Sequence, residues 1–195
     1  MKTMKLIVFL ALVFAFSLVA NCRTQAVKIQ EVQADSDAKV KEAIRIFDEF
    51  FDNLRAELMK AIQKNQFDGA ISVCKEISPA MERSYSEKYK MKIYRISDKY
   101  RNPDHKPTPD EMEVLNYWQE KMKQNQELKA VYFQVGNKTK VMKPIKTFAD
   151  LCLQCHGDPA KMNPAVLERI KKEYPDDKAV GYKLNDLRGA FVAEF

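Results

Sequence analysis

Two cysteines separated by two residues, with a histidine directly after the second, constrain this chain more than any other feature. They occur in the run Cys152-Leu153-Gln154-Cys155-His156. This spacing is typical of a c-type haem attachment site, where both thiols add to the vinyl groups of one porphyrin. The thiols must then lie close together on one side of a turn, and the adjacent imidazole can ligate the iron from the proximal side. The motif predicts one covalent haem c, with His156 as a metal ligand.

Two other kinds of site use closely spaced cysteines. A structural zinc site needs a second ligand pair, and the chain, with four cysteines and two histidines, has no second Cys-x-x-Cys and no His-x-x-x-His. A thioredoxin-like dithiol is expected beside a βαβ pattern, which is not evident before Cys152. The redox dithiol therefore stays as the alternative to haem.

The N-terminus has the pattern of an export signal. Two lysines in the first five residues precede an apolar run over 6–20, which is too short to span a bilayer stably. The run ends in Val19-Ala20-Asn21-Cys22, which predicts a lipoprotein signal over 1–21 and acylation of Cys22. Asn21 departs from the small residue usual at that position, so cleavage after Ala20 with a free Cys22 thiol is the alternative. We expect an exported protein, lipid-anchored to a membrane in the periplasm or at the outer membrane.

Composition argues against a nucleic-acid partner. Without Lys2 and Lys5 of the signal, 31 basic residues face 27 acidic ones, and the two signs are interleaved. The remaining length suits one domain with a core of its own. We expect a polar tether over 22–37 and a single domain over 38–195.

The first long helix has an apolar stripe at alternating spacings of four and three residues. Its members are Val40, Ile44, Phe47, Phe51, Leu54, Leu58 and Ala61. This spacing also occurs in coiled coils, so the helix over 40–61 could form a homodimer or could pack on its own domain. Both interpretations remain open.

The rest of the chain alternates helices and short strands. Phe67-Asp68-Gly69 predicts a break, and Thr108 with Glu111 forms a capping box. We expect a helix over 69–90 with a bend at Pro79, a strand over 91–97, a helix over 108–125, a hairpin of 131–135 with 140–146, a helix over 163–174 and a strand over 189–195. This order predicts the α+β class, with an antiparallel sheet covered by helices on one face.

The second axial ligand has several candidates. Cys74 lies on the stripe Ile71, Cys74, Ile77, Met81 and Tyr85, so we expect it to face inward, either as a small buried hydrophobe or as an iron ligand. His105 lies in a polar, proline-rich loop that we expect to be solvated. The methionines that could also ligate are Met81, Met112, Met142 and Met162. The residues alone leave this choice open.

Several motifs in fixed order carry a family resemblance. They are Ile71-Ser72-Val73-Cys74-Lys75-Glu76-Ile77-Ser78-Pro79, Arg101-Asn102-Pro103, Met142-Lys143-Pro144-Ile145, the haem motif with Gly157-Asp158-Pro159, Tyr174-Pro175-Asp176-Asp177-Lys178-Ala179-Val180-Gly181-Tyr182 and Asp186-Leu187-Arg188-Gly189-Ala190. Over 44–195 the chain resembles a family of exported c-type haem domains with a PAS-like fold, long filed as a domain of unknown function. Its members occur alone or as sensory inputs of bacterial signalling proteins.

The resemblance implies specific roles. Cys152 and Cys155 would bind haem, and Cys74 would occupy the family's distal cysteine position opposite His156. Arg188 and Arg101 fall in shared motifs and could pair with the haem propionates. The expected fold is a PAS-like antiparallel sheet with flanking helices and a long N-terminal helix.

An iron held by thiolate and imidazole has no open coordination position. The anionic sulfur favours ferric iron and lowers the reduction potential, so we expect an electron-transfer or redox-responsive protein with a redox partner that the sequence does not identify, and not an enzyme. The alternative is a redox or gas sensor in which Cys74 is displaced and a partner protein is signalled. A haem-free surface lipoprotein is the third possibility.

Overall fold

The computed structural model describes residues 26–195. The predicted signal over 1–21 and the predicted lipidation site at Cys22 lie outside this range. Among the described residues, no helix combines the length and the apolar character needed to cross a membrane.

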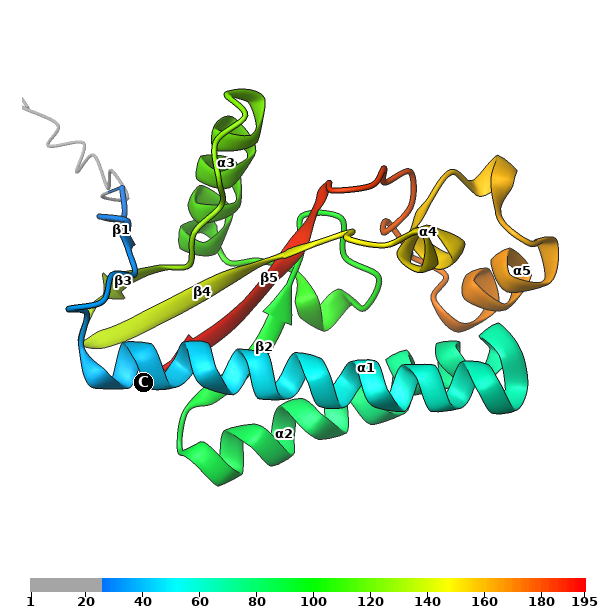
Figure 1. The fold of residues 1–195 in the computed structure, drawn as a ribbon, viewed down its shortest axis with the longest axis horizontal. Coiled ribbons are helices and arrows are strands. Elements are labelled where there is room, and N and C mark those ends of the chain that lie inside the picture. The colour runs from blue at the N-terminus through cyan, green and yellow to red at the C-terminus, as the bar shows by residue number, and fades with distance from the viewer. Residues whose placement is uncertain (1–25) are drawn as a thin grey trace, which may run out of the picture.

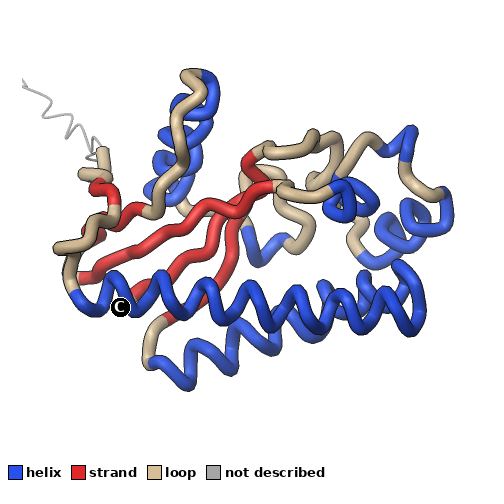
Figure 2. Tube along the Cα trace, in the orientation of Figure 1, coloured by secondary structure: helices blue, strands red, loops and turns tan. Residues whose placement is uncertain are grey.

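Five antiparallel strands form one sheet in the order β1-β3-β4-β5-β2 (Figures 1 and 2). The strands are β1 (Gln30–Glu31), β2 (Lys92–Ile96), β3 (Val131–Val135), β4 (Lys138–Lys146) and β5 (Leu187–Glu194). The predicted hairpin is confirmed as β3 and β4, whose register pairs Val135 with Lys138 across Gly136-Asn137. The α+β class with an antiparallel sheet is therefore confirmed.

Helices connect these strands. They are α1 (Ala38–Ser72), a π-helical turn (Val73–Ile77), α2 (Ser78–Tyr89), α3 (Pro109–Lys123), α4 (Asp150–His156) and α5 (Pro164–Glu173), with 3-10 turns at Pro103–His105 and Pro159–Lys161. The capping box of α3 is confirmed, since the Thr108 backbone N–H donates to Glu111 at 2.9 Å. The haem motif was expected on a turn and instead lies on the short helix α4.

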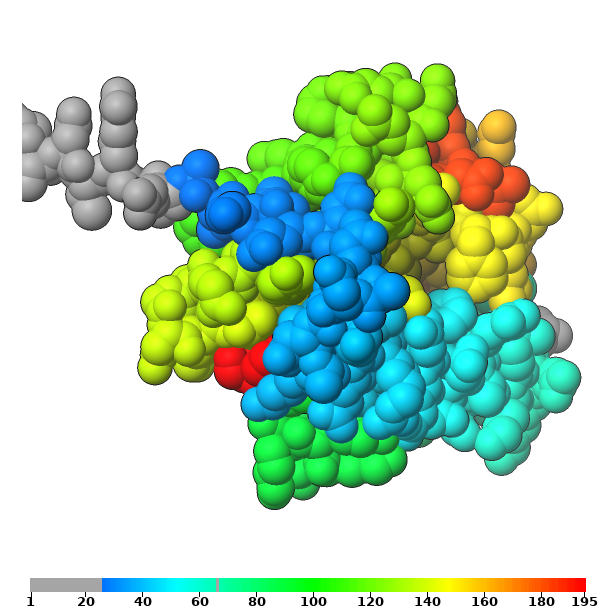
Figure 3. Space-filling view, turned by 60° about the vertical axis from the view of Figure 1, so that its left-hand side comes forward, coloured from blue at the N-terminus to red at the C-terminus, as the bar shows by residue number. Residues whose placement is uncertain are grey.

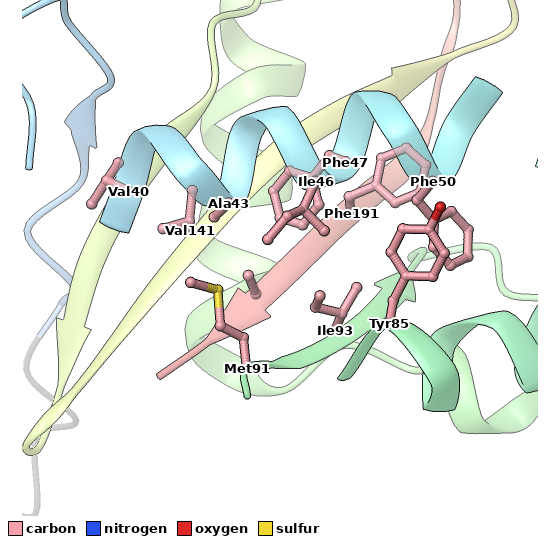
Figure 4. Close-up of a cluster of buried hydrophobic side chains, with 11 residues drawn as sticks. Val40, Ala43, Ile46, Phe47, Phe50, Tyr85, Met91, Ile93, Val141 and Phe191 are labelled. Atoms are coloured by element: carbon pink, nitrogen blue, oxygen red, sulfur yellow. The ribbon is translucent and has the colours of Figure 1, made fainter. Parts of the chain in front are cut away.

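Helices cover both faces of the sheet, where only one covered face was predicted. Val40, Phe47 and Phe50 of α1 pack on one face against Phe191 (Figure 4), and Leu115 and Trp118 of α3 pack on the other. Side chains alternate along a strand, so β5 sends Phe191 and Ala193 to α1 and Ala190 and Val192 to α3. A strand buried on both sides reads as a continuous apolar run, which conceals the second covered face.

The apolar stripe of α1 that could have paired two subunits packs inside the domain. Val40 and Phe47 are fully buried against the sheet, and Phe51 and Leu54 pack beside them. Leu58 continues the stripe along the wall of a cavity. This face of α1 contacts its own sheet, so the structure gives no support to a homodimer through the helix over 40–61.

The chain reverses where a break was predicted at Phe67-Asp68-Gly69, although helical hydrogen bonding continues to Ser72. A Cβ added at Gly69 would lie 2.7 Å from the carbonyl oxygen of Ala61. Eight residues of straight helix rise about 12 Å, so the backbone must bend sharply between these two positions. In Figure 1 the following helical segment returns alongside α1 and leads into α2. Pro79 lies in the first turn of α2, which agrees with the boundary predicted there.

The predicted tether over 22–37 contributes to the sheet. β1 pairs with β3, and the Val27 backbone N–H donates to Glu113 of α3 at 2.9 Å. Figure 3 shows the segment before α1 lying over the surface beside α3 and the β3–β4 hairpin. The two-residue strand is too short to give a periodic pattern, which explains why it was not predicted.

Candidate haem-binding site

A cavity of about 370 Å³ lies between the bent end of α1, the ends of the sheet strands and α4. Its wall is mainly apolar, and α1 contributes Phe51, Leu54, Leu58, Ile62, Phe67 and Ile71. Cys152, Cys155 and His156 line it from α4, and Cys74 lines it from the π-helical turn. Mainly apolar clefts with a few polar groups are typical cofactor sites, so the predicted iron and thioether residues are brought together.

The helix α4 presents the two thiols of the motif on one side. Cys152 and Cys155 are three residues apart, a spacing that places side chains on the same face of a helix. Both side chains are partly exposed to the cavity. The pair can therefore reach one ligand, as thioether attachment requires.

The His156 ring has one defined hydrogen bond. Its Nδ1 lies 2.8 Å from the carbonyl oxygen of Ala179, and since a carbonyl only accepts, Nδ1 carries the proton. Burial, with the charges of Arg188 and Arg101, holds the pKa of His156 well below its ordinary value. The ring is therefore neutral, and its Nε2 lone pair is available to a metal.

The segment over 177–182 is hydrogen-bonded to the haem motif. The Tyr182 N–H donates to the His156 carbonyl at 2.9 Å, and the Gly181 N–H donates to the Gly157 carbonyl at 2.7 Å. These bonds hold the end of α4 against a distant loop. The segment therefore fixes the position of the motif, a role that no local pattern indicates.

Arg101 links the same two segments. Its Nη2 donates to the Cys155 carbonyl at 2.6 Å, to Asp177 at 3.0 Å and to the Ala179 carbonyl at 3.3 Å. The side chains of Arg101 and Asp177 are 9% and 8% exposed. This nitrogen, which was predicted to pair with a propionate, is thus committed to protein oxygens, and Arg101 chiefly positions the motif.

The thiol of Cys155 has the wrong acidity for a redox dithiol. Burial raises its pKa to about 11, with smaller contributions from Cys74 and Cys152 and an opposing one from Arg101. A reactive dithiol needs a lowered thiol pKa, because the thiolate is the nucleophile. The raised pKa of the Cys155 thiol therefore counts against the dithiol alternative.

Cys74 faces inward as predicted and lies on the cavity wall, where its side chain is exposed and is not a small buried hydrophobe. The cause is the π-helical turn over Val73–Ile77, which rotates the stripe so that Ile77 is 40% exposed while Val73 is buried. Such turns re-aim side chains and occur frequently at functional sites. Cys74 therefore faces the same space as His156.

The other candidate distal ligands are placed differently from expectation. His105 was expected to be solvated, but it lines the cavity, and its Nε2 lies 3.3 Å from Glu82. Of the methionines considered, Met142 lies in the sheet core. Within the described part of the chain, none of Met81, Met112, Met142 and Met162 lines the cavity, whereas the unconsidered Met59 does.

Arginines cluster on the cavity wall. Arg188 and Arg95 line it, and the Nε atom of Arg188 is buried without a hydrogen-bond partner among the described residues. Burial lowers the pKa of Arg188. Arg95 was not predicted, because an arginine on a short amphipathic strand resembles an ordinary surface residue.

Comparison with known proteins shows the family to which the chain belongs. A family model described as Tll0287-like matches residues 21–195. The chain belongs to the Tll0287-like family. The fold is also that of the crystal structure of the cyanobacterial heme-protein Tll0287, with a TM-score of 0.62 at 18% sequence identity, covering 82% of this chain and 96% of that chain. No curated protein matches this chain.

The Tll0287-like match includes every described site residue. It spans Cys74, Arg101, the motif on α4 and the segment over 177–182 that holds it. The residues that enclose the cavity therefore belong to one family domain, although they lie far apart along the chain.

Proposed function

We propose that this protein carries one haem c, joined by thioethers to Cys152 and Cys155 and ligated by His156 and Cys74. One observation carries the proposal: a single cavity has on its wall two thiols at haem-attachment spacing, a neutral imidazole and a third thiol. The structural likeness to a protein described as a heme-protein supports it. The haem supplies one-electron redox chemistry when bound.

The polar groups of the cavity fit such a cofactor. The Nε atoms of Arg188 and Arg101 are buried without partners among residues 26–195, and buried guanidinium groups require acceptors. Haem propionates are acceptors of this kind, and we assign them chiefly to Arg188. The α+β domain is then a PAS-like module, in which the sheet and α1 enclose the cofactor.

The ligand set favours electron transfer over catalysis. His156 and Cys74 would fill both axial positions, and an anionic sulfur ligand stabilises ferric iron and lowers the reduction potential. We propose a low-potential electron-transfer or redox-responsive protein, exported and tethered to a membrane through lipid on Cys22. Its redox partner is a separate protein.

A sensor is the second candidate, and one observation favours it. Cys74 lies on a π-helical turn and is exposed to the cavity, so its displacement would not disrupt the sheet core. Reduction or a small gas could then release the sulfur and signal through a partner protein. A haem-free surface lipoprotein is the third candidate, and the converging thiols and imidazole count against it.

The test begins with expression in a host competent in cytochrome maturation. We expect a coloured protein whose mass is increased by one porphyrin, with a low-spin ferric spectrum. Cys74→Ala should convert that spectrum to one of a five-coordinate or water-ligated iron, because the sulfur ligand is lost. Ile77→Ala is the matched control, since Ile77 lies on the same turn but is not among the described residues that line the cavity. A colourless product would overturn haem binding, and an unchanged C74A spectrum would remove Cys74 as a ligand.

Membrane anchoring has a separate test. Cys22→Ser should release the protein into the soluble fraction of the exported material. Continued sedimentation of C22S with membranes would contradict acylation at this position. Reduction of the wild-type protein under nitric oxide separates the two roles, because a sensor should lose its thiolate spectrum under conditions where an electron carrier retains it.

A further inference from the structure

His105 is the histidine that the proposed site does not use. The chain has two histidines, and the function proposed above assigns His156 to the iron. His105 ends the 3-10 turn Pro103–His105 and lies on the wall of the same cavity, with 16% of its side chain exposed. Its backbone carbonyl accepts from the Ser97 N–H at 3.0 Å, which holds the turn against the end of β2. Histidine is the residue that most commonly gains or loses a proton between pH 5 and 8.

A carboxylate of α2 faces this imidazole. Glu82 Oε1 lies 3.3 Å from His105 Nε2 and accepts from Arg95 Nε at 2.8 Å. Only 12% of the Glu82 side chain is exposed. Burial alone would raise the pKa of Glu82, but hydrogen bonding from His105 and the charge of Arg95 hold it below its ordinary value. Glu82 is therefore ionised at neutral pH and stabilises a protonated His105.

The charges that face His105 oppose one another. Glu82 of α2 favours its proton, while Arg95 of β2 disfavours it and already neutralises Glu82. From the wall of the same cavity, Arg101 and Arg188 add further positive charge. An electron added inside the cavity adds negative charge near these groups and therefore favours a proton on His105.

We propose that His105 is a proton-binding site coupled to the oxidation state of the haem, an inference that rests on the function proposed above. On reduction, one electron from a one-electron donor enters the iron, and one proton from water binds the free imidazole nitrogen of His105. On oxidation both leave, the electron to an acceptor and the proton to water. Proton binding then offsets part of the negative charge that the electron brings into the cavity, and electron transfer is coupled to proton transfer.

The expected size follows from Coulomb's law. For two unit charges about 12 Å apart, an effective dielectric constant of about 20 gives an interaction equal to roughly a tenfold change in proton affinity. For a one-electron couple, a tenfold change corresponds to about 59 mV in reduction potential. The potential should therefore fall by about this amount as the pH rises through the titration of His105.

The experiment is a spectroelectrochemical titration of the haem-loaded protein from pH 5 to pH 9. We expect the wild-type potential to fall with pH and the His105→Gln potential to stay level, because glutamine retains a hydrogen bond but binds no proton. Lys106→Gln is the matched control, since it removes an exposed charge next to His105, and its curve should follow the wild type. Glu82→Gln should move the pH-dependent region to lower pH, because the stabilising carboxylate is lost.

Two results would overturn the proposal. A level wild-type curve would show that no proton accompanies the electron, and a wild-type curve retained in H105Q would assign the proton to another group, such as the Cys74 thiol or a propionate. Proton release on oxidation of unbuffered wild-type protein, followed with an indicator dye, tests the same step without a variant. A product without a haem spectrum would instead refute the proposed function, and this inference with it.

Discussion

Gly189→Ala is the substitution whose effect follows most directly from the structure. Gly189 has φ +157°, and a Cβ there would lie 2.1 Å from the carbonyl oxygen of Ile96. The position is also on the cavity wall, next to Arg188 and opposite Ile145 of β4. An alanine must therefore change the backbone of β5 or push the end of β2 away.

The magnitude combines three effects. A non-glycine residue in this backbone region costs about 2 kcal/mol, and relief of the overlap with β2 about 1 kcal/mol more. Displacing β2 also weakens the 2.8 Å hydrogen bond from Ser97 Oγ to the Arg188 carbonyl, worth about 1 kcal/mol. We expect G189A to lower the free energy of unfolding by about 4 kcal/mol, a large part of the usual stability of a domain.

The assay is urea denaturation of the haem-loaded protein at pH 7, followed by far-ultraviolet circular dichroism. Gly136→Ala is the control, because Gly136 also has a positive φ, +61°, but nothing lies within 4 Å of the added Cβ. It should lose only about 1 kcal/mol. Equal losses in G189A and G136A would refute the close approach of β2 to β5 that the reasoning requires.

Three further substitutions test other contacts. Arg101→Met leaves Asp177 buried without its cation and should lower the free energy of unfolding by about 3–5 kcal/mol. Arg169→Met, which removes the more exposed Arg169–Glu173 pair, should change it by less than about 1 kcal/mol. Similar midpoints of urea denaturation for the two variants would contradict this. Hydrogen bonds from Lys121 and Tyr117 lower the pKa of Glu31 to about 2, so ionised Glu31 stabilises the folded protein fully above about pH 5, and this contribution is lost as the pH falls toward 2. Glu31→Gln should remove that part of the dependence of the unfolding free energy on acid pH. An unchanged pH profile of denaturation would count against the contact. Lys140→Met leaves the fully buried Glu111 without its cation and should lower the free energy of unfolding by about 3–5 kcal/mol. The double variant Lys140→Met with Glu111→Leu should recover most of this loss. A double variant as unstable as the single one would argue against the ion pair.

The sequence by itself determined the features that depend on neighbouring residues. The spacing of Cys152, Cys155 and His156 predicts haem attachment because the two thioethers and the proximal ligand all arise within two turns of chain. The Thr108 capping box and the β3–β4 hairpin are confirmed, since hydrogen bonds across a few residues decide them. The stripe predicted that Cys74 faces inward, which agrees with its place on the cavity wall, and the family resemblance favoured it as the distal ligand.

Only the tertiary structure decided which distant groups meet. The structure shows that Arg101 binds Asp177 and that His105 pairs with Glu82, although the partners lie far apart in the sequence. It also shows that a π-helical turn places Cys74 on the wall of the cavity that His156 lines. Periodicity shows that a residue is on an apolar face, but not which neighbour covers that face. The neighbour that covers each apolar face depends on how α1 bends and on how both faces of the sheet are packed. The burial of apolar surface over the whole domain determines this packing, and no local rule does.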